Sequence, residues 1–380
     1  MKHRITLALA SLALVACGEN DINAPERAAS LAVSSGRSAP GAVYTLTNQT
    51  SGNAVAIFDR SANGVLTFAG EAPTGGLGTG DGLSSQGAVV LSEDARWLLA
   101  VNAGSDDISI FAVTPSGLSH VQRIASGGVR PVSIAIREGL VYVLNAGGSG
   151  SIAGFVQDSS GTLAPIAGAS RPLSAPDAGA AQISFTPDGG ALIVTERFTN
   201  VIDVYTLNPD GSASEPRVHP SSGVTPFGFD FGQRGTLIVS EAFGGAPDAS
   251  AASSYLVGPN GELSLVTGSL GTTESSACWL VVSKDGRFAY AANTGSNTVS
   301  GYAIGQDGSL TLLDVDGVTG PGADAGPADI ALSEDGQFLY VLTRGTNSVT
   351  RFERRTSDGS LERASAVDGL PVGTVGLAVR

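Results

Sequence analysis

The stretch Ser276–Tyr302, SACWLVVSKDGRFAYAANTGSNTVSGY, contains three short strand patterns separated by turn signals. The first apolar run leads to Asp285-Gly286, where Asp bonds to the local backbone and Gly takes a left-handed conformation. A second run ends at Asn293, and the third reaches Tyr302. Gln306-Asp307-Gly308 then precedes a fourth strand pattern. We therefore expect this unit to form one four-stranded antiparallel sheet.

The same unit recurs along the chain at intervals of 43 to 54 residues. The end of its second strand identifies seven copies, at Asn48, Asn102, Asn145, Glu196, Glu241, Asn293 and Thr343. A period of about 40–50 residues with four strands per repeat is that of β-propeller blades. The sequence therefore predicts an all-β, seven-bladed β-propeller of four-stranded antiparallel blades over residues 41–380.

The first and last copies are incomplete in complementary ways. The apolar inner strand that precedes every later copy is missing in front of Ala42, whereas the last copy is followed by the strand pattern Gly373–Val379. We expect this C-terminal strand to fill the inner position of the first blade and so close the ring. Both chain ends would then belong to one sheet.

Composition excludes several functions. The 380 residues carry a formal net charge of −14, whereas a nucleic-acid surface needs clustered Lys and Arg, so we expect no nucleic-acid partner. Of the three His, His120 and His219 lie in different copies, and His3 lies near the N-terminus. We therefore expect no metal site and no cofactor. Since the ring is self-contained, we expect a monomer.

The N-terminus has the pattern of an export signal. A basic head at residues 2–4 precedes the apolar run Ile5–Ala16, which is too short to span a bilayer. The run ends in Leu14-Val15-Ala16-Cys17, which resembles a bacterial lipobox. We predict a lipoprotein signal peptide over residues 1–16, lipidation of Cys17 and a flexible tether over residues 17–40. We expect the protein to be located in the bacterial cell envelope, anchored by its lipid to the outer membrane and facing the periplasm or the cell surface.

The repeat resembles the lactonase-type seven-bladed propellers, which include 6-phosphogluconolactonase-like and carboxymuconate cyclase-like proteins. It is also similar to the Tyr-Val-Thr-Asn repeats of surface proteins. The resemblance rests on an apolar inner strand, a Pro-Asp-Gly turn and a second strand, best seen from Gln182 to Thr195. In lactonase-type members a His usually starts this inner strand. Here Gln182 follows Ala180-Ala181, and no other copy supplies a His.

Charged residues gather where each second strand ends and each inner strand begins. In an antiparallel blade these two points lie on the same rim, so we expect the following residues to face one mouth: Arg130, Glu196, Arg197, Glu241, Asp329 and Arg344. Carboxylates replace the usual Asn only at Glu196 and Glu241. The candidate ligand-binding residues are therefore Arg130, Gln182, Glu196, Arg197 and Glu241, while solvated rim charges are the simpler interpretation.

Two functions remain open. One is an exported, lipid-anchored binding or scaffold protein that displays a rim to a small molecule, a polymer or a protein, which the missing His favours. The other is a lactone hydrolase or a related cyclase that acts through the Glu/Arg rim, so whether the protein is an enzyme stays open. Long Gly-rich connections such as Glu71–Ser85 are expected to form much of one rim.

Overall fold

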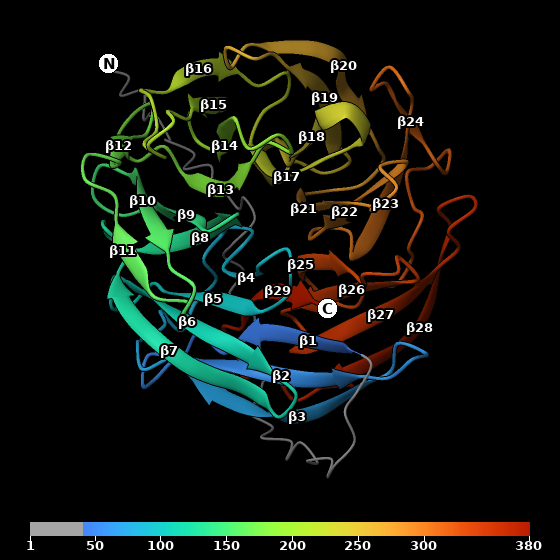
Figure 1. The fold of residues 1–380 in the computed structure, drawn as a ribbon. Coiled ribbons are helices and arrows are strands. Elements are labelled where there is room, and N and C mark those ends of the chain that lie inside the picture. The colour runs from blue at the N-terminus through green and yellow to red at the C-terminus, as the bar shows by residue number, and fades with distance from the viewer. Residues whose placement is uncertain (1–40) are drawn as a thin grey trace, which may run out of the picture.

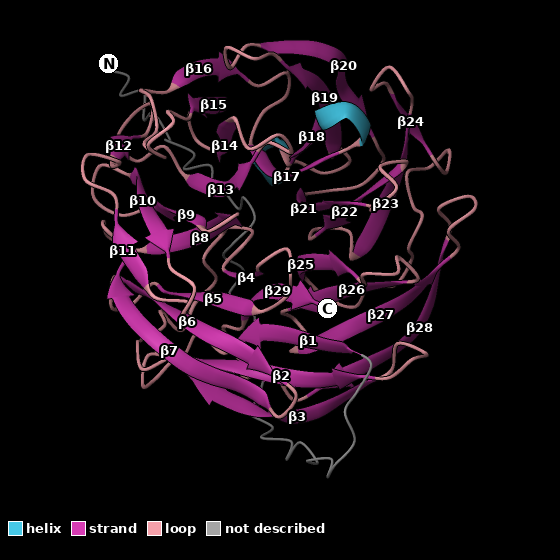
Figure 2. Ribbon diagram, viewed as in Figure 1, coloured by secondary structure: helices cyan, strands magenta, loops and turns pink. Residues whose placement is uncertain are grey.

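The computed structural model describes residues 41–380, which form seven antiparallel sheets in a ring (Figure 1). Strands and loops make up almost the whole ring, and the described helices are the one-turn 3-10 helices η1 (Gln233–Gly235) and η2 (Phe243–Gly245) (Figure 2). This confirms the predicted seven-bladed propeller. None of the helices within residues 41–380 is long and apolar enough to cross a membrane.

Each blade is described from its inner strand to its outer strand. The first blade contains β29 (Val375–Val379), β1 (Gly41–Leu46), β2 (Ala54–Arg60) and β3 (Leu66–Pro73). The second contains β4 (Val89–Leu91), β5 (Trp97–Asn102), β6 (Asp107–Thr114) and β7 (Gly117–Ala125). The third contains β8 (Pro131–Arg137), β9 (Leu140–Asn145) and β10 (Ser151–Gln157), followed by a split outer strand of β11 (Leu163–Pro165) and β12 (Arg171–Pro172).

The remaining four blades repeat this order. The fourth contains β13 (Ala180–Phe185), β14 (Ala191–Glu196), β15 (Val201–Thr206) and β16 (Arg217–Pro220). The fifth contains β17 (Pro226–Phe231), β18 (Thr236–Glu241), β19 (Ala251–Val257) and β20 (Leu263–Gly271). The sixth contains β21 (Ala277–Val282), β22 (Phe288–Asn293), β23 (Thr298–Ile304) and β24 (Leu310–Leu312). The seventh contains β25 (Pro327–Leu332), β26 (Phe338–Thr343), β27 (Ser348–Arg354) and β28 (Leu361–Asp368).

The C-terminal strand closes the ring as predicted. β29 pairs antiparallel with β1, with Val43 opposite Val379 and Leu46 opposite Val375. In Figure 1 the red end of the chain therefore lies beside its blue beginning. The β1 edge that would otherwise be unpaired is covered by the chain's own last strand, which removes a site for edge-to-edge aggregation.

The turn signals fold by the chemistry that the sequence indicates. After β21 the hydroxyl of Ser283 donates to Asp285 Oδ1 at 2.6 Å, and Gly286 takes a φ of 64°. The turn after β25 repeats this arrangement with Ser333 and Asp335, also at 2.6 Å. A polar side chain that satisfies the turn backbone and a glycine that tolerates positive φ together join the inner strand to the second strand.

Buried tyrosines connect neighbouring blades. Tyr142, Tyr290 and Tyr340 occupy the same position of the second strand, and each hydroxyl donates to the carbonyl oxygen of a turn glycine in the following blade. The distances are 2.7–2.8 Å, to Gly211, Gly359 and Gly64 respectively. Each aromatic ring thus fills the apolar layer between two blades while its polar end is satisfied.

Candidate ligand-binding site

The propeller has two ends, which we call the N rim and the C rim. Inner strands begin at the N rim, where the second strands end: Ala180 lies opposite Glu196, and Pro226 opposite Glu241. Inner strands finish at the C rim, in the turns that lead to the second strands. The sequence places the candidate site at the N rim.

Glu196 lies at the N rim, but its side chain is fully buried within the fourth blade. Its carboxylate accepts hydrogen bonds from the backbone N–H of Ser174 at 2.9 Å, from the Ser174 hydroxyl and from the Thr199 hydroxyl at 2.5 Å. Asp203 lies beside it. Burial, and then the Glu196 carboxyl, raise the pKa of Asp203 above its ordinary value, so Asp203 favours its protonated form.

Glu241 occupies the corresponding position of the fifth blade and is also fully buried. Its carboxylate accepts hydrogen bonds from the backbone N–H of Gly223 at 2.8 Å and from the hydroxyls of Ser253 and Ser269 at 2.5 and 2.6 Å. Burial raises its pKa, although these hydrogen bonds lower it in part. Both predicted carboxylates are therefore bonded to their own blades and to the connections that lead into them, and they do not converge on one pocket.

The two predicted arginines lie at the N rim in different environments. Arg130 is exposed, with a φ of 54°, and its backbone N–H donates to Asp106 Oδ1 at 2.7 Å. Arg197 is half-buried and its Nε donates to the Gly179 carbonyl at 3.2 Å. Its guanidinium carbon lies 4.8 Å from the centre of the Phe198 ring, a cation–π distance. Ligand binding by these residues stays a prediction.

Gln182 lies deeper, on the inner strand β13. Its amide accepts from the backbone N–H of Phe229 at 2.8 Å and donates to the carbonyl of the same residue at 2.9 Å. Two other inner strands make similar contacts with the blade that follows. Ser133 accepts from the backbone N–H of Ile183, and Asp230 accepts from the backbone N–H of Val282. Side chains of one blade thus form hydrogen bonds with backbone groups at the inner edge of the next blade. Without them, water would have to provide these hydrogen bonds.

A segment of the long connection after β3 crosses the central channel. The Gln86 side chain exchanges hydrogen bonds with the backbone of Leu280, at 2.7 Å from its amide nitrogen and 3.0 Å to its amide oxygen. The Trp279 indole N–H donates to the Ser85 carbonyl at 2.9 Å. The second and sixth blades are therefore linked across the axis. The end of this connection therefore forms part of the channel interior, in addition to the rim that the sequence predicts for the long connections.

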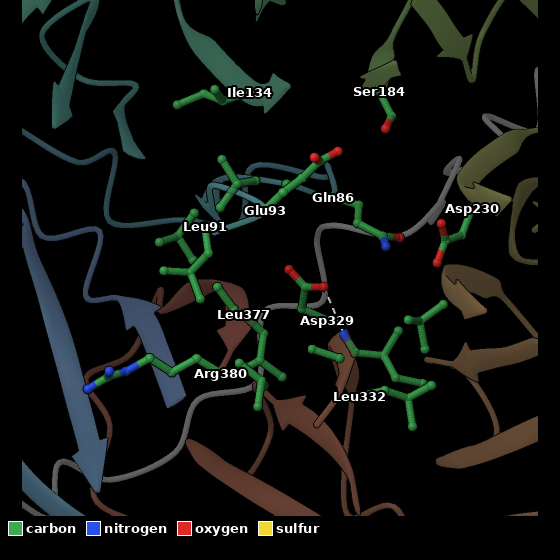
Figure 3. Close-up of a pocket in the computed structure, with 18 of the residues that line it drawn as sticks. Gln86, Leu91, Glu93, Ile134, Ser184, Asp230, Asp329, Leu332, Leu377 and Arg380 are labelled. Atoms are coloured by element: carbon green, nitrogen blue, oxygen red, sulfur yellow. Dashed lines mark hydrogen bonds between the residues drawn. The ribbon is translucent and has the colours of Figure 1, made fainter. Parts of the chain in front are cut away.

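Below Gln86 lies a cavity of about 650 Å³. Its wall includes residues of the C rim turns, among them Glu93, Lys284 and Glu334, so it opens at the C rim. Of the five predicted site residues, Gln182 lines this cavity. Figure 3 shows its interior, with Gln86, Asp230 and Asp329 among the residues that line it.

Asp230 and Asp329 are the acidic groups inside this cavity. Asp230 accepts from the backbone N–H groups of Phe231 and Val282, both at 2.8 Å, and burial raises its pKa to about 6. Asp329 is 2% exposed, and burial raises its pKa well above the ordinary value. Its Oδ1 accepts from the backbone N–H of Ile330 at 2.8 Å, and interactions of the carboxyl with the backbone N–H groups of Ile330 and Leu377 lower the pKa in part.

The position of Asp329 corrects the expectation that it faces the N rim. It pairs with Leu342, inside the strand rather than at its end, and lines the cavity that opens at the opposite rim. The sequence signal that could have located it was a carboxylate within an otherwise apolar inner strand, since buried charges are rare without a partner. Within residues 41–380 no group of three or more His, Cys, Asp or Glu could hold a metal ion.

The protein is therefore a seven-bladed β-propeller with an axial cavity lined by polar residues. The family model described as lactonase, 7-bladed β-propeller, matches residues 44–171 and 280–369, together more than half of the chain. The chain belongs to this family. No protein with a curated description matches the sequence.

Solved structures share the fold. A protein of Lactobacillus plantarum is 21% identical, covers 90% of this chain and 99% of its own, and gives a TM-score of 0.72. A candidate 6-phosphogluconolactonase of Bacteroides fragilis is 18% identical, with 91% and 100% coverage and a TM-score of 0.70. The periplasmic gluconolactonase of Pseudomonas aeruginosa is 17% identical, with 89% and 99% coverage and a TM-score of 0.65. At sequence identities of 17–21%, these similarities show a shared fold.

Proposed function

We propose that this chain is a binding member of the lactonase propeller family and that the axial cavity holds its ligand. The observation that carries the proposal is the axial cavity of about 650 Å³, whose lining includes the polar side chains of Gln86, Gln182 and Asp230. Ligand pockets typically have such volumes and contain a few convergent polar groups. The buried, internally bonded Glu196 and Glu241 support a role for this cavity over a catalytic rim.

The test is to fill the cavity. Ala331 is half-buried and lines it, so Ala331→Trp would occupy part of the space, whereas Ala366→Trp would add the same side chain to the exposed outer strand β28. We expect small molecules identified in a screen of sugars, lactones and amines to bind the wild type and the Ala366 variant but not the Ala331 variant. Equal binding by both variants would contradict the proposal.

A lactone hydrolase is the second candidate, and one specific observation favours it. Asp230, with a pKa of about 6, could exchange a proton near neutral pH, as a general acid or base must. A titration of acid release from glucono-1,5-lactone would detect this activity. Turnover above the buffer rate that disappears in Asp230→Asn would support hydrolysis, and no turnover would leave the binding function.

We also propose that the protein is exported and anchored to a membrane through Cys17. The support is the basic head, the short apolar run and the sequence Leu14-Val15-Ala16-Cys17, all outside the described residues. In a bacterial host, the wild type should sediment with membranes, and Cys17→Ser should remain unprocessed or appear in the soluble fraction. Normal processing and unchanged sedimentation of Cys17→Ser would contradict the anchor.

A further inference from the structure

A second cavity, of about 350 Å³, lies at the C rim between the second and third blades, and we call it the inter-blade cavity. The turns that join β4 to β5, β8 to β9 and β10 to β11 form most of its wall. Residues 92–94 line both this cavity and the axial cavity, so the first of these turns separates the two. In Figure 1 the two blades, which begin with β4 and β8, lie next to each other.

Trp97 in the wall of the inter-blade cavity departs from the repeat. It begins β5 and packs against Gly161, a turn residue of the following blade. Phe288 and Phe338 begin β22 and β26, pack against a turn glycine of the following blade in the same way, and are each 6% exposed. A phenylalanine therefore meets the packing need of this position. The larger indole of Trp97 is only half-buried and lines the cavity, which blade packing does not require.

Two neutral polar groups in the cavity wall have no hydrogen-bond partner within residues 41–380. The first is the indole N–H of Trp97, whereas the indole N–H of Trp279 donates to the Ser85 carbonyl at 2.9 Å. The second is the amide oxygen of Gln157, whose amide nitrogen donates to the Gly161 carbonyl at 3.3 Å. The cavity thus offers one donor and one acceptor to a ligand.

The charged groups of the wall, by contrast, already have partners. Their ion pairs are Arg96 with Asp94 at 2.8 Å, Arg137 with Glu93 at 3.0 Å and Arg137 with Glu138 at 3.6 Å. The remaining carboxylate, Asp158, accepts from the Ser160 hydroxyl at 2.6 Å and from the backbone N–H of Thr162 at 3.0 Å. An ionic ligand would have to compete for charges that are paired and exposed, which offers it little net gain. A neutral ligand needs no such exchange.

We propose that the inter-blade cavity binds a neutral saccharide through the indole N–H of Trp97 and the amide oxygen of Gln157. A sugar hydroxyl can accept from the first group and donate to the second. The apolar C–H face of a sugar ring suits the aromatic ring of Trp97 and the side chain of Ile136, which also lines the cavity. The volume lies in the range of small-molecule sites. This inference goes beyond the proposed function, because the site lies outside the axial cavity.

The experiment titrates the full chain with four neutral disaccharides, maltose, cellobiose, lactose and trehalose, up to about 100 mM, and follows tryptophan fluorescence. The chain has two tryptophans. Trp279 is 4% exposed and its indole is already bonded, so Trp97 should give the signal. Trp97→Phe removes the indole N–H and the reporter but restores the residue type of two other blades, so it should melt like the wild type.

A second pair of variants does not depend on Trp97. Ser159 is exposed and lines the inter-blade cavity, so Ser159→Phe should narrow it. Gln306 is exposed at the same position of the corresponding turn in the sixth blade, outside both cavities, so Gln306→Phe is the matched control. Ligand-observed NMR measures the affinity of all variants without relying on fluorescence.

We expect at least one of the four disaccharides to change the fluorescence of the wild type, with a Kd in roughly the millimolar range. Trp97→Phe should show no fluorescence change and bind about five- to tenfold more weakly, as the loss of one hydrogen bond predicts. Ser159→Phe should also bind more weakly, and Gln306→Phe should bind like the wild type. No response to any of the four sugars, wild-type affinity in Trp97→Phe, or equal affinity in the Ser159 and Gln306 variants would overturn the inference.

Discussion

At the scale of single residues, burial raises the pKa of Asp203, Asp230, Glu241 and Asp329. An acid whose pKa is higher in the folded state binds more protons folded than unfolded. Above the ordinary carboxyl pKa of about 4, each such group therefore makes the folded state less stable as pH rises, until its raised pKa is passed. This protein should be more stable at mildly acidic pH than at neutral pH.

We expect Asp203→Asn to reduce that pH dependence. The Asn amide can donate to Glu196 as a protonated Asp203 would, but it cannot ionise. Between pH 5 and 7.5, the free energy of unfolding of the wild type should fall, and the slope should be smaller in the variant by up to about 1 kcal/mol per pH unit. Urea titrations at several pH values measure the free energy of unfolding and therefore this slope. Glu362 is an exposed carboxylate on the outer strand β28, so Glu362→Gln should keep the wild-type slope. An unchanged slope in Asp203→Asn would show that this carboxyl is ionised in the fold.

Gln182→Ala should destabilise the protein, since it leaves the N–H and C=O of Phe229 without their side-chain partner. We expect a loss of about 1–3 kcal/mol in the free energy of unfolding. Gln122 provides a matched control, because its amide makes the same pair of bonds to the backbone of Leu163 between two outer strands. Water reaches that site more easily, so Gln122→Ala should cost less. If denaturant titrations showed the same loss of unfolding free energy in Gln182→Ala and Gln122→Ala, this role of burial would be contradicted.

At the scale of the element, the inner strand departs from regular pairing at its start. The register shifts after the first pair in β8, β13, β17, β21 and β25, and β29 has a shift where it pairs with β1. Such bulges bend a strand and increase its twist. Here they occur at the N rim, where the strand enters the crowded axis of the ring.

At the irregular start of β29, the backbone of Gly376 has a positive φ and lies close to Val89 of the second blade. Its φ is 75°, and a Cβ there would lie 2.9 Å from a Val89 side-chain carbon and 3.0 Å from the Val89 backbone nitrogen. Gly168 has a similar φ of 72° but nothing within 4 Å of its Cβ position. Gly168→Ala should therefore cost only the conformational strain, about 1–2 kcal/mol, and Gly376→Ala about 1–3 kcal/mol more. Thermal unfolding of both variants measures the difference, and similar melting temperatures would contradict the packing constraint.

At the scale of the whole molecule, the last strand completes the first sheet and so closes the ring. A chain that ends at Thr374 would lack β29, which buries Val375, Leu377 and Ala378. We expect such a truncation to lose roughly 4–8 kcal/mol, comparable with the total stability of many domains, and to aggregate through β1. Size-exclusion chromatography and thermal unfolding would show this, and a peptide of residues 373–380 added in excess should partly restore the fold. A truncation that melts like the full chain would contradict closure.

The blade, the number of blades and the closure of the ring could all be predicted from the sequence. These depend on local signals: turns such as Asp285-Gly286 fix backbone conformation, alternating apolar runs define strands, and the period counts copies. The inner strand that is missing before Ala42 and the extra strand pattern at Gly373–Val379 together predicted that the last strand completes the first blade. At Gln182 the sequence also identified a cavity-lining residue, although its amide serves the backbone of the next blade.

Which polar groups are accessible could not be predicted from the sequence, because it depends on how the blades pack in the closed ring. Glu196 and Glu241 depart from the repeat as a functional residue would, yet hydroxyls and backbone N–H groups of their blades and of the connections into those blades enclose them. The floor of the cavity depends on a contact between Gln86 and Leu280, 194 residues apart. A repeat pattern specifies each blade through near neighbours, but burial and cavity shape come from contacts between blades, which side-chain packing fixes only once the ring has closed.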